Sequence, residues 1–138
     1  MAAHILKIQV SWTGDNFCCL WNNNEAGTVM ATAKTLAKLK KDFAESLKWH
    51  IEGCASDGDN LPKYLLTGDY ELKYDLDTAA LLRDAETYTT IAAISRASGI
   101  NQKQLSHYAN GVKQPRPTQR ARIIAGLRII GSQLLSLC

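Results

Sequence analysis

Four hydrogen-bonding side chains are spaced along one short polar segment near the C-terminal end of the chain. They are Gln102, Lys103, Ser106 and His107, within the run 102–109. On a helix, a step of four residues places Gln102 next to Ser106 and Lys103 next to His107. In the major groove of DNA, Gln pairs well with adenine, Lys with guanine, and Ser with bases or phosphate. The segment therefore predicts a recognition helix that contacts the base edges of double-stranded DNA.

The charge of the chain is divided along its length. Residues 87–138 contain seven cations and no Asp or Glu, whereas residues 1–86 contain nine Lys or Arg against thirteen Asp or Glu, a net charge of −4. A cationic surface without nearby acids suits a polyanion, because each phosphate that is neutralised releases a counterion. The split also suggests two parts with different partners.

Further residues in the cationic part are predicted to contact the DNA backbone. Thr90 precedes an apolar run, so it and the first amides of the helix that follows lie where a phosphate can bind. Three cations are expected to neutralise phosphates, which adds affinity but no sequence information. They are Arg96, Lys113 and Arg116.

The first 76 residues read as strands around one helix. Apolar side chains alternate along residues 5–12 and 70–76, which is typical of half-buried strands. A stripe from Leu36 to Ile51 recurs at steps of three and four, which predicts a helix capped by Thr32 and ended by Gly53. The remaining predicted strands are 17–21, 27–31 and 63–66.

After Leu76 the period becomes helical. We predict helices over about 77–85, 90–97 and 102–109, and a last helix that starts at Thr118. The predicted boundary separates domains 1–76 and 77–138. A helical piece of this size is marginal alone, so we expect it to dock against a second copy.

Residues 91–108 resemble a helix-turn-helix. Ser95 is small enough for two helix backbones to approach where they cross, although the motif usually has Ala there. Gly99 tolerates the positive φ that the turn needs. Ile94, Ile100, Leu105 and Tyr108 fall where the motif buries apolar side chains. The following Asn110-Gly111-x-Lys113-x-Pro115 also resembles the loop of Xre/Cro-like repressors.

The order of elements as a whole resembles the HicB-type antitoxins. The resemblance implies an α+β fold, in which a partial, non-catalytic ribonuclease-H-like β-β-β-α-β unit precedes an all-α helix-turn-helix domain. It implies that the first unit neutralises a small basic HicA-like mRNA-cleaving toxin. It also implies that a homodimer, or a higher homo-oligomer, represses its own operon by binding the operator. The acidic balance of residues 1–86 agrees with a cationic partner. The alternative is an Xre-like regulator whose N-terminal domain senses a ligand and has no toxin partner.

We expect no enzyme activity, metal or cofactor. The carboxylates that a two-metal nuclease would need fall in turn sequences, where Asp is common for local hydrogen bonding. These are Asp15, Glu25, Asp57, Asp59 and Asp69. No C-x-x-C spacing, membrane span or signal peptide is apparent, so we expect free thiols and a cytoplasmic protein. We assign the three tryptophans to the core or a dimer seam, and His50 to a helix surface.

Overall fold

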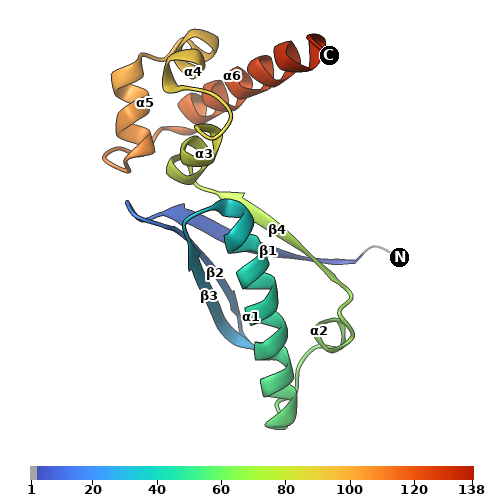
Figure 1. Ribbon diagram of the computed structural model, residues 1–138. Helices are drawn as coiled ribbons and strands as arrows, with labels where there is room; N and C mark the ends of the chain where they lie inside the picture. Colours follow the sequence, from blue (N-terminus) through green and yellow to red (C-terminus); the bar gives the residue numbers. More distant parts are fainter. Residues whose placement is uncertain (1–2) are drawn as a thin grey trace. The chain divides into compact units, whose positions relative to one another are not determined.

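The computed structural model describes residues 3–138 as an α+β chain with a four-stranded mixed sheet. The chain divides into two compact units, residues 1–77 and 78–138 (Figure 1). The predicted boundary lies one residue earlier. Each unit has its own buried core and is described by itself below.

The sheet of the first unit has the order β3-β2-β1-β4. Its strands are β1 (His4–Trp12), β2 (Phe17–Asn23), β3 (Gly27–Ala33) and β4 (Tyr70–Leu76). The first three form antiparallel hairpins, whereas β4 pairs parallel to β1, with Ile8 opposite Tyr74. The strand predictions for these four segments are confirmed, although β2 and β3 each run two residues further.

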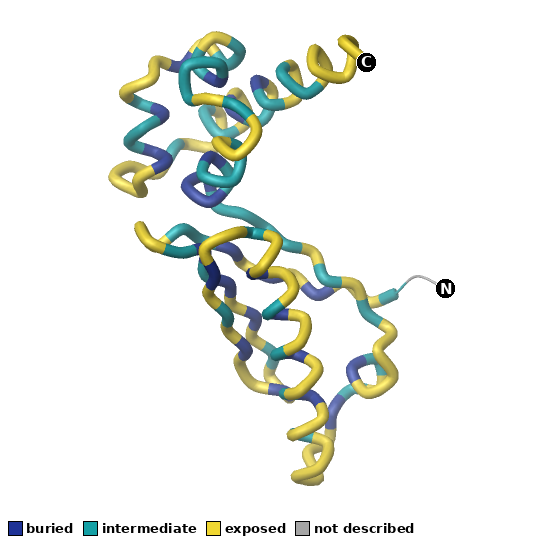
Figure 2. The backbone as a smooth tube through the Cα atoms, in the orientation of Figure 1, coloured by how far each residue is buried: buried dark blue, intermediate teal, exposed yellow. Residues whose placement is uncertain are grey.

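One long helix, α1 (Leu36–Ser56), packs on one face of this sheet (Figure 1). The predicted stripe is confirmed, because Leu39, Phe43, Leu47 and Ile51 are buried (Figure 2). Leu6, Ile8 and Val10, the inward residues of β1, are buried as well. Period two in the strand and period 3.6 in the helix thus supply the two sides of one core.

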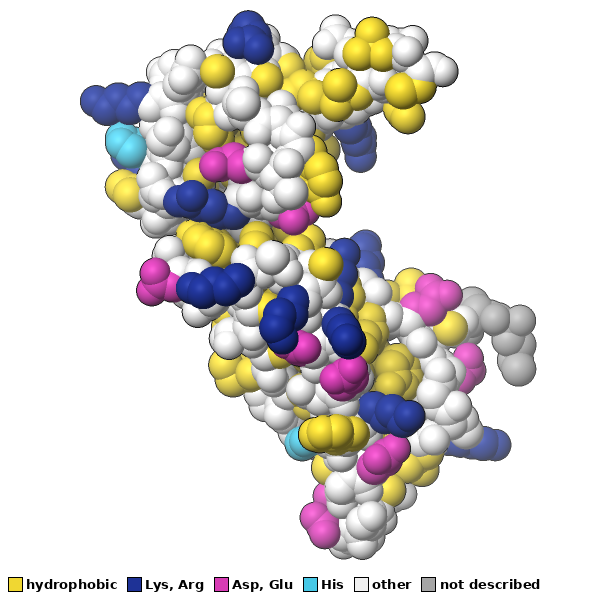
Figure 3. All heavy atoms as spheres, in the orientation of Figure 1, with side chains coloured by type: hydrophobic (Ala, Val, Ile, Leu, Met, Phe, Trp, Pro, Cys, Tyr) yellow, Lys and Arg dark blue, Asp and Glu magenta, His cyan; other side chains and the backbone are white. Residues whose placement is uncertain are grey.

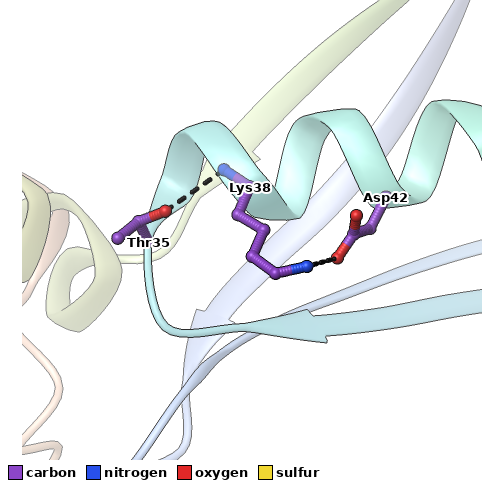
Figure 4. Close-up of polar contacts among 3 residues, drawn as sticks. All are labelled: Thr35, Lys38 and Asp42. Atoms are coloured by element: carbon purple, nitrogen blue, oxygen red, sulfur yellow. Dashed lines mark hydrogen bonds and ion pairs between the residues drawn. The ribbon is translucent and has the colours of Figure 1, made fainter.

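The predicted ends of α1 are wrong at both termini. The N-cap is Thr35, whose hydroxyl accepts a hydrogen bond from the Lys38 amide at 3.2 Å (Figure 4). Thr32 cannot cap the helix because β3 continues to Ala33. The helix also passes through Gly53 to Ser56, since the Asp57 amide donates to the Gly53 carbonyl at 3.0 Å. One glycine does not outweigh a packed apolar face.

Residues 63–66, predicted to be a strand, instead belong to the short helix α2 (Lys63–Thr67). Pro62 precedes its first turn, and Gly68 ends it in the left-handed region at φ 75°. Both residues are typical of helix ends. Four residues are too few for alternation to separate a strand from one helical turn that buries Leu65.

The second unit contains four helices. They are α3 (Thr78–Ala85), α4 (Ile91–Ser98), α5 (Gln102–Ala109) and α6 (Pro117–Ser136). Their shared core is Leu82, Ile94, Ile100, Leu105, Tyr108, Ala109 and Ile123. The helix predictions are confirmed, except that α6 begins at Pro117 and not at Thr118. Proline is favoured at the first helical position because its missing N–H has no partner there.

Of the two places predicted for the tryptophans, the core or a dimer seam, the structure excludes the core for Trp49, and the surface position predicted for His50 needs correction. Trp21 is buried and Trp12 half-buried, but Trp49 is 75% exposed on α1 and so lies outside the core. His50 is half-buried, and its Nε2 hydrogen-bonds the carbonyl oxygen of Ala26 just before β3. The helix stripe predicted the buried residues of α1 but could not show which flanking residues reach another segment.

Candidate nucleic-acid interface

The start of α4 is fixed by Thr90, its N-cap residue. Its hydroxyl accepts a hydrogen bond from the Ala93 amide at 3.0 Å, and its carbonyl accepts from the Ile94 amide at 3.0 Å. Thr90 is exposed, and no acidic residue lies in the first turn. The end of α4 that carries partial positive charge therefore faces solvent without a neutralising side chain.

Gly99 joins α4 to α5 at φ 75°, where a residue with a side chain would be strained. Its amide donates to the Ser95 carbonyl at 2.9 Å and closes α4. The Ser95 hydroxyl donates in turn to the Ile100 carbonyl at 2.6 Å. The sequence predicted only that Ser95 is small enough for the helices to approach. Its hydroxyl also hydrogen-bonds the end of α4 to the residue that leads into α5.

The inward face of α5 is apolar. Asn101 caps the helix by accepting from the Gln104 amide at 2.8 Å. Leu105, Tyr108 and Ala109 are buried, and the Tyr108 hydroxyl accepts from the Gln104 side chain at 2.7 Å. Because these contacts occupy one side of the helix, the rotation of α5 about its own axis is fixed.

The four predicted base contacts of α5 differ in their exposure. Gln102 and Lys103 in the first turn are exposed, whereas Ser106 and His107 one turn later are half-buried. The Nδ1 atom of His107 is buried and has no hydrogen-bond partner within residues 3–138. Gln102 and Lys103 can therefore reach furthest from the unit, and His107 can offer a partner only its other ring nitrogen.

The end of α5 is held by a residue that no sequence motif singled out. Arg83 of α3 donates from Nε to the Ala109 carbonyl at 3.2 Å, and from a terminal nitrogen to the Asn110 side chain. A cation here also suits the partial negative charge of a helix C-terminus. Local sequence patterns carry no signal for this contact, because Arg83 and Ala109 are 26 residues apart.

The predicted backbone cations lie in different environments. Lys113 is exposed in the turn after α5, where the Val112 amide donates to the His107 carbonyl at 2.9 Å. Arg116 is exposed at the N-cap position of α6. Arg96 is also exposed but lines a groove formed with the end of α6. The structure thus places Lys113 against the end of α5 and gives Arg96 a surface that the other predicted contacts do not line.

The thiols and carboxylates of the first unit form no comparable site. Within residues 3–138, no group of three or more His, Cys, Asp or Glu side chains is arranged to hold a metal ion. Cys54 Sγ lies 3.6 Å from His50 Nε2. Desolvation, followed by the neighbouring Asp59, raises the pKa of Cys54 above its ordinary value. This thiol is therefore less ionised than an ordinary one, the opposite of an activated nucleophile.

Comparisons of the chain with known protein families, curated proteins and solved structures found no match. Among residues 3–138, no helix combines the length and the apolar character needed to cross a membrane.

Proposed function

We propose that the second unit is a helix-turn-helix DNA-binding domain, with α5 as its recognition helix. One observation carries the proposal: Gln102 and Lys103 are exposed on the first turn of a helix whose other side is locked into the core. The absence of Asp and Glu from residues 87–138 supports it, because no carboxylate of that segment would repel phosphate. The phosphate contact of Thr90 and the base contacts of Ser106 and His107 stay predictions.

We further propose that the chain is a HicB-type antitoxin whose first unit, of partial ribonuclease-H-like type, masks a small basic mRNA-cleaving toxin. The chain then represses its own operon through the second unit. The first unit, residues 1–77, has eight Lys or Arg against eleven Asp or Glu, and this net charge of −3 supports a basic partner. The exposed Trp49 adds a candidate anchor, because Trp is enriched among the residues that dominate binding energy.

The surroundings of Trp49 fit a cationic partner. Glu45 and Glu52 lie four residues before and three residues after Trp49 on α1, so the three share one side of the helix. All three are exposed. Acidic side chains also lie among the cations on the visible face of the first unit (Figure 3). Asp42, a further turn back, is paired with Lys38 at 2.7 Å (Figure 4).

The DNA proposal is tested by comparing base-reading and phosphate-neutralising residues in gel-shift titrations. We expect Gln102→Ala and Lys103→Ala each to weaken binding by about 1–3 kcal/mol, on the specific site only, because each removes one side chain that reads a base. Arg116→Ala serves as the matched control, because it should weaken all sequences alike and reduce the salt slope. Equal operator affinity of the double variant and the parent would refute the assignment of α5.

The toxin proposal is tested with the small basic protein that a neighbouring reading frame is expected to encode. Trp49→Ala should weaken its binding by about 2 kcal/mol or more, roughly thirtyfold, if Trp49 is an anchor. Met30→Ala is the control, since Met30 is 60% exposed on β3 instead of α1. No copurifying basic protein would favour the alternative, an Xre-like regulator that senses a ligand.

A further inference from the structure

The last turns of α6 carry an apolar surface that the core of the second unit does not cover. Leu134 is 52% and Leu137 81% exposed, and nearby Tyr88, in the segment before α4, is 76% exposed. Hydrophobic side chains gather around the end of α6 in Figure 3. Exposed aliphatic and aromatic residues grouped in this way mark an interaction site.

A groove runs beside this surface. It has a volume of about 710 Å³ and lies between the start of α4 and the end of α6. Ala93 and Ala97 of α4 line one wall. Ile129 and Ile130 of α6 and Leu137, its C-cap residue, line the other. A smaller apolar hollow of about 190 Å³ adjoins it, since Tyr88, Ile130 and Leu134 line both. Projecting side chains and hollows therefore occur on the same surface.

This surface has almost no charged side chains, which argues against DNA or a strongly charged protein as its partner. Residues 129–138 contain no Asp, Glu, Lys, Arg or His. Of the described residues, Arg96 is the only charged one that lines either hollow. A cationic toxin would find no Asp or Glu side chain in the lining of either hollow. An uncharged surface that has both projections and hollows can instead match itself across a two-fold axis, because each copy then supplies what the other lacks.

We propose that the groove between α4 and the end of α6 is the seam of a two-fold dimer of this chain. The side chains at the end of one α6 fill the groove of the other copy. The position of the seam is inferred only from the exposed apolar side chains and the two hollows described above. The two-fold symmetry also rests on the proposed function, because proteins that read a palindromic operator through such a motif bind its two halves as a dimer. A helical unit of 61 residues gains most from such a partner, since small domains bury the smallest share of their surface.

The chain offers a matched pair of substitutions on one helix. Leu134 and Leu137 both line the groove, whereas Leu135 does not. At 3.6 residues per turn, Leu135 lies about 100° from Leu134 and about 160° from Leu137 around α6. Leu135 is 79% exposed, close to the 81% of Leu137. A carboxylate at Leu135 therefore changes charge and hydropathy on α6 without entering the proposed seam.

The test is sedimentation equilibrium of the full chain without DNA. The parent and Leu135→Glu should dimerise with similar dissociation constants, and Leu134→Glu/Leu137→Glu should raise the constant at least tenfold. A parent that stays monomeric, or a Leu135→Glu variant that dissociates as much as the double variant, would overturn the proposal. So would dissociation caused by Met30→Glu alone, which would place the seam on the sheet.

Two further measurements separate loss of the dimer from unfolding and from loss of DNA binding. Circular dichroism checks that each variant is folded, and Leu134→Ala/Leu137→Ser replaces the double Glu variant if that one is not. Binding to a DNA half-site, which needs only one α5, should be unchanged in the dissociated variant. A folded parent that does not bind a half-site would count against the DNA proposal, whereas a parent that is a monomer would count against the seam.

Discussion

Gly126→Ala should destabilise the second unit although alanine is the better helix former. Gly126 is buried in α6 where that helix passes the end of α4. A Cβ atom at this position would lie 3.0 Å from the backbone nitrogen of Ser98 and 3.1 Å from its Cα. The obstacle is backbone, so it cannot move aside as the tip of a flexible side chain would. Ser98 also precedes the Gly99 turn, so a shift there reaches the start of α5.

Two opposing effects set the size of the change. Replacing glycine by alanine inside a helix gains about 0.5–1 kcal/mol, because glycine loses more backbone entropy on folding. Forcing one extra carbon into a packed contact costs about 1–3 kcal/mol. The net destabilisation is therefore about 0–2.5 kcal/mol, and each kcal/mol lowers the melting temperature of a domain of this size by about 4–8 °C.

Gly131→Ala is the control on the same helix. A Cβ atom there would have no neighbour within 4 Å, so only the helix-propensity gain applies and the melting temperature should rise. Calorimetry of the full chain would measure both variants, and titration with DNA would follow. If Gly126→Ala proves as stabilising as Gly131→Ala, the close approach of α4 and α6 is wrong, and with it the position of α5 relative to α6.

Two other predictions concern a cap and a thiol. Asn101→Ala removes the side chain that accepts a hydrogen bond from the Gln104 amide. It should lower the free energy of unfolding by about 1 kcal/mol and weaken specific DNA binding. Urea unfolding measures the change in stability, and an unchanged midpoint would contradict it. Burial raises the pKa of Cys19 from 9.0 to about 11, so iodoacetamide at pH 8 should modify exposed Cys138 long before Cys19. Since the unfolded thiol loses its proton near pH 9 and the folded one only near 11, this group's contribution to stability should fall as the pH rises through that window.

Secondary structure in this chain could be predicted where apolar residues recur with one period over several repeats. The alternation in β1 and β4 and the stripe of α1 each span several repeats, and all three were assigned correctly. Residues 63–66 were too short for a period to be decided. The errors at Thr32 and Gly53 have a different cause. Each residue favours a helix end locally, but a continuing strand or a packed helix face outweighs that preference.

The candidate sites divide in the same way. Local motifs predicted Thr90 and Gly99, because caps and turns depend on neighbours in sequence. The contact of Arg83 with Ala109, and the groove that joins Tyr88 to the end of α6, depend on residues far apart in sequence. The sequence does contain one sign of the groove. Residues 129–138 carry no charge directly after a segment rich in arginine.

The structure also changes what the charge count of the second unit means for DNA binding. Two of the seven cations in residues 87–138 already have partners inside the unit: Arg120 donates to the Thr78 hydroxyl at 2.9 Å, and Arg122 donates to the Ser98 carbonyl at 3.2 Å. Arg96 lines the groove, and Arg128 lies on the C-terminal half of α6. Lys103, Lys113 and Arg116 remain, exposed on α5 and the turn that follows it.

For B-DNA, each neutralised phosphate contributes about −0.9 to the slope of log affinity against log salt concentration. Because Lys103 is assigned to a base, Lys113 and Arg116 alone give a slope of about −2 per protomer, whereas all seven cations would give about −6. The slope for one half-site measures this difference directly. A value near −6 would mean that the cations bonded within the unit, and those on α6 and beside the groove, also reach phosphates.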